Sequence, residues 1–188
     1  MKIMKYTSLA ILLGASFCGT CRAEIGSQKE LAVALEQAIQ CKVEAVDALN
    51  PQSKPEVQKN LARLGVKVQG VDANYDADAD SSWKLDYALP AGVDVFGHEV
   101  RTAHYAGYSA SFFFTEIPGG QSELDKLRDM LRLGPAAPGS ISADIEYATY
   151  KPVYEKQVPW RDGKATVVAG LERKNGQAYV VVGCVTPA

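Results

Sequence analysis

The sequence predicts an α+β domain: an antiparallel sheet of about six strands, two N-terminal helices and one further helix packed on it, a C-terminal β-hairpin and one disulfide. Three features of the 188-residue chain lead to this prediction. Apolar residues recur at helical spacing near the N-terminus, they alternate with polar residues further along, and turn-forming Gly, Pro and Asn separate these segments. Residues 24–188 contain neither a repeat nor a linker, so we expect a single domain there.

Residues 1–23 have the organisation of a cleavable secretory signal peptide. Two lysines precede an apolar run from Tyr6 to Phe17, and the small residues Cys21 and Ala23 occupy the third and first positions before the expected cleavage site. This run is shorter than the roughly 20 residues that a membrane-spanning helix needs. We therefore expect a periplasmic or secreted protein that begins near Glu24 and does not insert into a membrane after cleavage.

The charge balance argues against nucleic acid as a partner. Cleavage would remove Lys2, Lys5 and Arg22 but no acidic residue, so the net charge of −2 would become −5. Binding to nucleic acid requires clustered Lys and Arg that neutralise phosphates. We expect a different class of partner.

Residues 24–188 contain two cysteines, Cys41 and Cys184. In an oxidising compartment an isolated pair most simply forms a disulfide. Neither has a Cys or His close to it in sequence, which argues against a metal or redox site. The predicted bridge joins the first helix to the last strand and closes almost the whole domain as one loop.

Three helices are predicted from periodicity and end signals. The first covers residues 27–49, with Ser27 and Glu30 spaced as in a capping box. The second covers residues 53–64 and ends at a glycine, and the third covers residues 122–133, with leucines three and four residues apart. These helices supply the layer that we expect to cover the sheet.

Strands are predicted between and after these helices. Alternation of apolar and polar residues is clearest in residues 82–89, and the run Phe112-Phe113-Phe114 indicates burial on both faces of its strand. The apolar parity changes at Gly97, where we expect a bulge. The remaining predicted strands cover residues 66–71, 93–105, 108–117 and 145–150.

The C-terminal hairpin is the most specific local prediction. Asn175-Gly176 is the preferred pair for a two-residue type I′ turn. Pairing outward from this turn sets three apolar pairs on one face: Leu171 with Val180, Ala169 with Val182, and Val167 with Cys184. That face is therefore the core face, and Cys184 points toward the covering helices.

The chain lacks the motifs of serine hydrolases, zinc proteases and phosphate-binding loops. Its two histidines, His98 and His104, would lie roughly 20 Å apart on a straight strand, too far for one shared site unless a turn or second bulge intervenes. We interpret both as structural or surface residues. No catalytic residue, no cofactor and no metal is predicted.

An acidic segment is more distinctive. Alternate residues from 72 to 80 are Asp or Asn, as at the start of a calcium loop, but the later Gly and Glu of such a loop are absent. The segment is either a solvated loop or a recognition element. Four aspartates within nine residues repel one another, and a cationic partner would relieve that repulsion. We predict Asp76, Asp78 and Asp80 as partner-binding residues.

Aromatic residues near the C-terminus are predicted as anchors of the same interface. Tyr147 and Tyr150 have opposite strand parity, so at least one faces away from the core, and Trp160 follows shortly after. Exposed Tyr and Trp are common interface anchors, whereas packing in the core or at its rim is the alternative for each.

These features favour an exported protein-binding domain, an inhibitor or immunity protein that neutralises a basic toxin or cell-wall-degrading enzyme. The alternatives are an accessory or structural component of the envelope or a secretion system, a small-ligand binder, and a hydrolase that uses dispersed carboxylates and His98.

Overall fold

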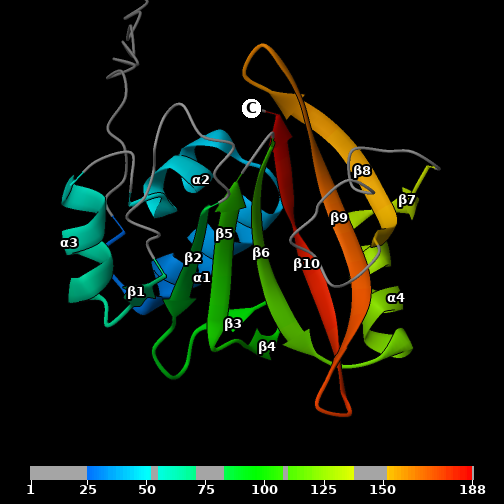
Figure 1. The fold of residues 1–188 in the computed structure, drawn as a ribbon, viewed down its shortest axis with the longest axis horizontal. Helices are drawn as coiled ribbons and strands as arrows, with labels where there is room; N and C mark the ends of the chain where they lie inside the picture. Colours follow the sequence, from blue (N-terminus) through cyan, green and yellow to red (C-terminus); the bar gives the residue numbers. More distant parts are fainter. Residues whose placement is uncertain (1–24, 52–54, 71–82, 108–109, 138–151, 188) are drawn as a thin grey trace, which may run out of the picture.

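The computed structural model describes residues 25–51, 55–70, 83–107, 110–137 and 152–187. Eight strands form one antiparallel sheet in the order β1-β2-β5-β6-β10-β9-β8-β7 (Figure 1). The predicted α+β class is confirmed, with eight strands in the sheet where about six were expected. In chain order the elements are α1 (Gln28–Ile39), α2 (Val43–Leu49), α3 (Pro55–Arg63), β1 (Lys67–Gln69), β2 (Trp83–Ala88), β3 (Asp94–Val95), β4 (His98–Glu99), β5 (Thr102–Gly107), β6 (Ala110–Pro118), α4 (Gln121–Leu131), β7 (Gly134–Pro135), β8 (Pro152–Trp160), β9 (Gly163–Lys174) and β10 (Gln177–Pro187).

The helices cover one face of the sheet and form the main core with it. Helix α1 contacts β6 and β10, α4 contacts β9, and α3 lies beside the edge strand β1 (Figure 1). Apolar side chains of α1, α2 and α4 pack there against alternate residues of the strands, among them Phe113, Val180 and Val182. Among the described residues, no helix is long and apolar enough to cross a membrane.

The first predicted helix is interrupted at Cys41, so the described residues form four helices rather than three. Cys41 has a φ of 59° and follows Gln40, the C-cap residue of α1. The Lys42 N–H donates to the Gln37 carbonyl and the Cys41 N–H to the Ala38 carbonyl, both over 2.9 Å. This is the Schellman pattern that ends many helices, usually with glycine in the left-handed position. The break went unpredicted because a cysteine occupies that position.

The C-terminal hairpin matches its prediction residue by residue. Asn175 and Gly176 have φ values of 51° and 79°, as a type I′ turn requires. Val180 lies opposite Leu171, Val182 opposite Ala169 and Cys184 opposite Val167. The Cys41–Cys184 disulfide is present, with a Cα–Cα distance of 5.2 Å.

Two parts of the strand prediction differ from the structure. Phe96 and Gly97 both have positive φ and turn the chain between β3 and β4, so a tight hairpin stands where a bulge was expected. Strand β8 was missed because its first and penultimate residues, Pro152 and Pro159, are prolines, which are confined to edges and ends of sheets. Its outer neighbour is the two-residue β7. The predicted strand 145–150 lies outside the described residues.

Candidate functional site

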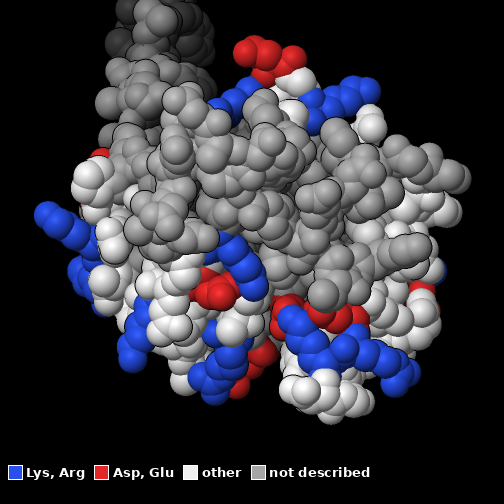
Figure 2. Space-filling model, in the orientation of Figure 1, with Lys and Arg blue, Asp and Glu red and all other residues white. Residues whose placement is uncertain are grey.

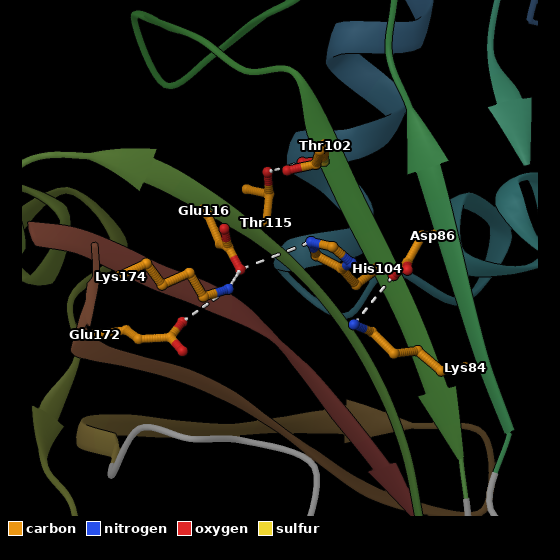
Figure 3. A network of polar contacts seen from close by, with 8 residues as sticks. All are labelled: Lys84, Asp86, Thr102, His104, Thr115, Glu116, Glu172 and Lys174. Carbon is orange, nitrogen blue, oxygen red and sulfur yellow. Dashed lines mark hydrogen bonds and ion pairs between the residues drawn. The ribbon is translucent and has the colours of Figure 1, made fainter. Parts of the chain in front are cut away.

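The sheet face opposite the helices carries a row of charged and polar side chains from four strands. Figure 3 shows this group, which we call the His104 network; it consists of Lys84 and Asp86 from β2, His104 from β5, Glu116 from β6, and Glu172 and Lys174 from β9. All six residues belong to the strand parity that the helices do not cover. In Figure 2, Lys and Arg lie beside Asp and Glu on this face rather than in separate patches of one sign.

Strand register places Asp86 and Phe114 on either side of His104. Asp86 is the cross-strand partner of His104 on β2, and Phe114 is its partner on β6. The imidazole Nδ1 lies 2.6 Å from Asp86 Oδ1, a short hydrogen bond. The imidazole ring stacks on the Phe114 ring with centroids 4.7 Å apart. Both contacts hold the ring in one orientation.

The second ring nitrogen has no hydrogen-bond partner among the described residues. Nε2 of His104 is buried, and Glu116 Oε1 lies 3.7 Å from it, beyond hydrogen-bond distance. The exposed fractions of the two side chains are only 11% and 12%. Because most buried polar atoms are hydrogen-bonded, this bare nitrogen requires an explanation.

Lys174 supplies positive charge at the β9 end of the network. Its ammonium group forms an ion pair with Glu116 and lies 3.3 Å from Glu172 Oε2. Strand β10 lies between β6 and β9, so the contact between Lys174 and Glu116 reaches across one whole strand. A flexible four-carbon stem makes that reach possible.

The environment shifts the pKa values of three groups in the network: His104, Asp86 and Lys174. Burial is the largest influence on His104 and lowers its pKa, although the Asp86 hydrogen bond and the Glu116 charge act in the opposite direction. Burial alone would raise the pKa of Asp86, but hydrogen bonds from His104 and Lys84 together lower it. Burial opposes the charge of Lys174, yet Glu116 and Glu172 raise its pKa. At neutral pH the carboxylate of Asp86 and the ammonium of Lys174 are therefore charged and the imidazole is neutral.

An apolar cluster adjoins the network on the same face. Its rings and aliphatic side chains are buried and come from β6, β9 and β10: Phe112, Phe114, Val168, Val181 and Val185. Phe112 and Phe114 stack with centroids 4.5 Å apart. The expected burial of both faces at the Phe112–Phe114 run is confirmed, since Phe113 faces the helices.

His98 belongs to a different group. Its Nε2 lies 2.8 Å from Glu123 Oε1 on α4, and Lys126 lies 3.1 Å from the other oxygen of the same carboxylate. The Lys126 hydrogen bond, followed by the contact with His98, lowers the pKa of Glu123. The two histidines therefore have separate sets of partners, and His98 joins the β3–β4 hairpin to α4.

Most of the predicted partner-binding residues lie outside the described part of the chain. This holds for Asp76, Asp78, Asp80, Tyr147 and Tyr150.

Trp160 ends β8 and is 6% exposed, packed in the main core. Its ring lies 5.5 Å from the Arg161 guanidinium carbon, and Arg161 forms a 3.0 Å ion pair with Asp47. In the described structure the indole therefore packs in the core, and Arg161 beside it forms the ion pair with α2.

Chemically, the His104 network can hold and move a proton. An imidazole with a carboxylate at one nitrogen and a second carboxylate near the other has the groups for acid–base exchange. Among the described residues, no three His, Cys, Asp or Glu side chains are arranged to hold a metal ion. Sequence reasoning missed this network. Its only local signal is the pairing of opposite charges two residues apart at 84–86 and 172–174, on the parity opposite to the core residues.

Comparison with known proteins yields no relative from which a function can be transferred. No protein-family model matches the chain, and neither a curated protein nor a solved structure is significantly similar to it.

Proposed function

We propose that the chain is an exported protein-binding domain that neutralises another protein, such as a toxin or a cell-wall-degrading enzyme. The observation that carries this proposal is the bridge between Cys41 and Cys184, which are 143 residues apart in sequence. Disulfides form and persist in oxidising compartments, and small exported domains use them to reinforce their cores. The bridge is thus in keeping with export directed by residues 1–23.

The same bridge favours binding as the role of the domain. It ties the junction between α1 and α2 to β10, which lies inside the sheet between β6 and β9. A framework that is rigid before association loses little conformational entropy when it binds. The acidic segment 72–80 connects β1 to β2 in this framework, and residues 147 and 150 lie between β7 and β8 in sequence.

The charge of the acidic segment defines the class of partner. Carboxylates at Asp76, Asp78 and Asp80 attract a basic surface and raise the rate of encounter with it. Enzymes and toxins that act on anionic envelope polymers tend to present such surfaces. Neutralisation then follows from occupation of the basic cleft.

Partner capture followed by binding kinetics tests the proposal. Residues 24–188 are immobilised to capture a partner from envelope extract. The variant Asp76→Asn/Asp78→Asn/Asp80→Asn is expected to associate more slowly, with a weaker dependence on salt, because screening limits exposed charges to about 8 Å at physiological ionic strength. Addition of the wild-type chain in equimolar amount is expected to inhibit the partner. Loss of Tyr147 or Tyr150 is expected to speed dissociation by about 30-fold or more, which corresponds to at least about 2 kcal/mol.

A matched control removes the same charge elsewhere. Glu44, Glu56 and Asp162 are exposed, so Glu44→Gln/Glu56→Gln/Asp162→Asn changes the net charge equally without touching the acidic segment. This control should leave most of the association rate intact. A partner that binds the triple Asn variant with unchanged rate and salt dependence would contradict the role of the acidic segment, and a bound partner that stays fully active would contradict neutralisation.

A hydrolase is the second candidate, and the His104 network is the observation that favours it. Asp86 orients Nδ1 and leaves Nε2 as an acceptor, the arrangement of a general base. Because Nε2 is buried, a substrate would have to gain access to it. Hydrolysis of an ester or glycoside that is lost in His104→Gln and kept in His98→Gln would establish this activity in place of neutralisation.

A further inference from the structure

The buried Nε2 of His104, which has no hydrogen-bond partner among the described residues, plays no part in the proposed neutralisation. In the neutral ring Nδ1 carries the hydrogen and donates to Asp86, which makes Nε2 an acceptor. Glu116 Oε1, which is also an acceptor, lies 3.7 Å from Nε2. Two acceptors face each other across a buried gap without a hydrogen between them, an arrangement that costs free energy.

Carboxylates lie on both sides of the His104 imidazole. Asp86 and Lys84 face the imidazole from β2 and Glu116 faces it from β6. Lys174 and Glu172 complete the group from β9. A proton on His104 would therefore interact favourably with the carboxylates of both Asp86 and Glu116.

We propose that the Asp86–His104–Glu116 row is a proton-binding site, in which the proton taken up at Nε2 competes with Lys174 for the carboxylate of Glu116. On uptake, the Glu116 carboxylate and the imidazolium approach each other from 3.7 Å until Nε2–H donates to Oε1, while Nδ1–H keeps its hydrogen bond to Asp86. Glu116 then faces two cations, which repel each other. Lys174, whose side chain is 44% exposed, turns toward Glu172 or solvent.

Proton uptake and Lys174 are thereby linked. If the proton weakens the contact between Lys174 and Glu116, loss of that contact must favour the proton by the same free energy, because linkage between binding equilibria is reciprocal. As the pH falls, Glu116 thus exchanges its contact with the Lys174 ammonium for a hydrogen bond from the His104 imidazolium. Burial lowers the pKa of His104 below the ordinary value of 6.5, so the change takes place on the acid side of neutrality.

The test is an NMR titration of the folded protein. The chain contains two histidines, so His98→Gln identifies the His104 signals directly. Spectra that distinguish a bare from a protonated ring nitrogen follow Nε2, and the Lys174 ammonium signals are followed in the same samples. Both are expected to change with one common midpoint.

Two variants are expected to shift that midpoint in opposite directions. Glu116→Gln shifts it to lower pH, because the carboxylate charge is removed and the amide donates a hydrogen bond to the bare Nε2. Lys174→Met shifts it to higher pH, because the competing cation is gone. Lys126→Met is the matched control: it breaks the ion pair with Glu123 on α4 and should leave the midpoint of His104 in place.

Opposite shifts in the two variants would establish the competition. The proposal is overturned if neither variant moves the His104 midpoint, or if the ring stays neutral at every pH at which the protein is folded. Lys174 is half-exposed, so its variant should fold and give a result even where Glu116→Gln does not.

Discussion

Reduction of the Cys41–Cys184 bridge is expected to lower the free energy of unfolding by roughly 5 kcal/mol. The two cysteines are 143 residues apart in sequence. In the chain-entropy model, closing a loop of this length removes about 17 cal/mol/K of entropy from the unfolded chain, or about 5 kcal/mol at 25 °C. Single domains are typically stable by about 5–15 kcal/mol. The bridge should therefore supply a large share of the total stability.

Packing of the two sulfurs must be separated from the crosslink. Both cysteines are buried, with 2% and 0% of their surface exposed. Reduction of the wild-type protein opens the crosslink but keeps both sulfurs in the core, whereas Cys41→Ala/Cys184→Ala removes them as well. The difference between the reduced wild type and the double variant therefore measures packing alone, and the difference between the oxidised and reduced wild type measures the crosslink.

Urea unfolding at pH 7, followed by circular dichroism, compares the three forms. The oxidised wild type is expected to have the highest midpoint. The reduced wild type and the double variant should show a steeper dependence of stability on urea, because an unfolded chain without the bridge exposes more surface. If the oxidised and reduced wild type unfold at the same urea concentration, the bridge does not stabilise the fold and the entropy argument fails.

Three further predictions concern the sheet and are measured by the same unfolding experiment. Gly183→Ala should cost at least about 3 kcal/mol, since an added Cβ would lie 2.3 Å from a carbonyl oxygen of β6. At Gly176 an added Cβ would meet no atom within 4 Å, but φ is +79°, so Gly176→Ala should cost only about 1 kcal/mol. Equal losses of stability in the Gly183→Ala and Gly176→Ala variants would contradict the steric argument. Tyr87→Phe should cost about 1–3 kcal/mol, because it leaves a buried carbonyl of α2 without its 2.9 Å hydrogen bond; an unchanged midpoint would mean that this bond contributes nothing. The lowered pKa of His104 means that its stabilising contribution is complete above the ordinary value of 6.5 and is lost as the pH falls toward the folded-state pKa. His104→Gln should flatten this loss, and an identical pH profile in the variant would refute it.

Local sequence patterns determined the elements whose geometry depends on neighbouring residues. Asn175-Gly176 predicted a type I′ turn, the turn set the register of β9 against β10, and the register placed Cys184 on the core face. Each of these steps needs only residues close together in the chain. The disulfide followed because Cys41 was the one other cysteine in residues 24–188.

Other backbone features depended on contacts distant in sequence. Cys41 and Phe96 adopt positive φ although neither is glycine. Their residue types therefore did not predict the end of α1 or the turn between β3 and β4. At Cys41, the side chain forms the disulfide with Cys184. At Phe96, the backbone N–H donates to Glu36 Oε1 on α1 over 2.7 Å. Strand β8 forms despite two prolines because β9 supplies a continuous partner.

The candidate site was decided by tertiary structure alone. Whether His104 meets Asp86 depends on the register of β2 against β5, and the contact of Glu116 with Lys174 joins residues 58 positions apart across an intervening strand. The parity of a strand tells which face a polar side chain occupies, but not which other strand will lie beside it. Burial then sets the ionisation of His104, and burial arises only when the strands and their neighbours have come together.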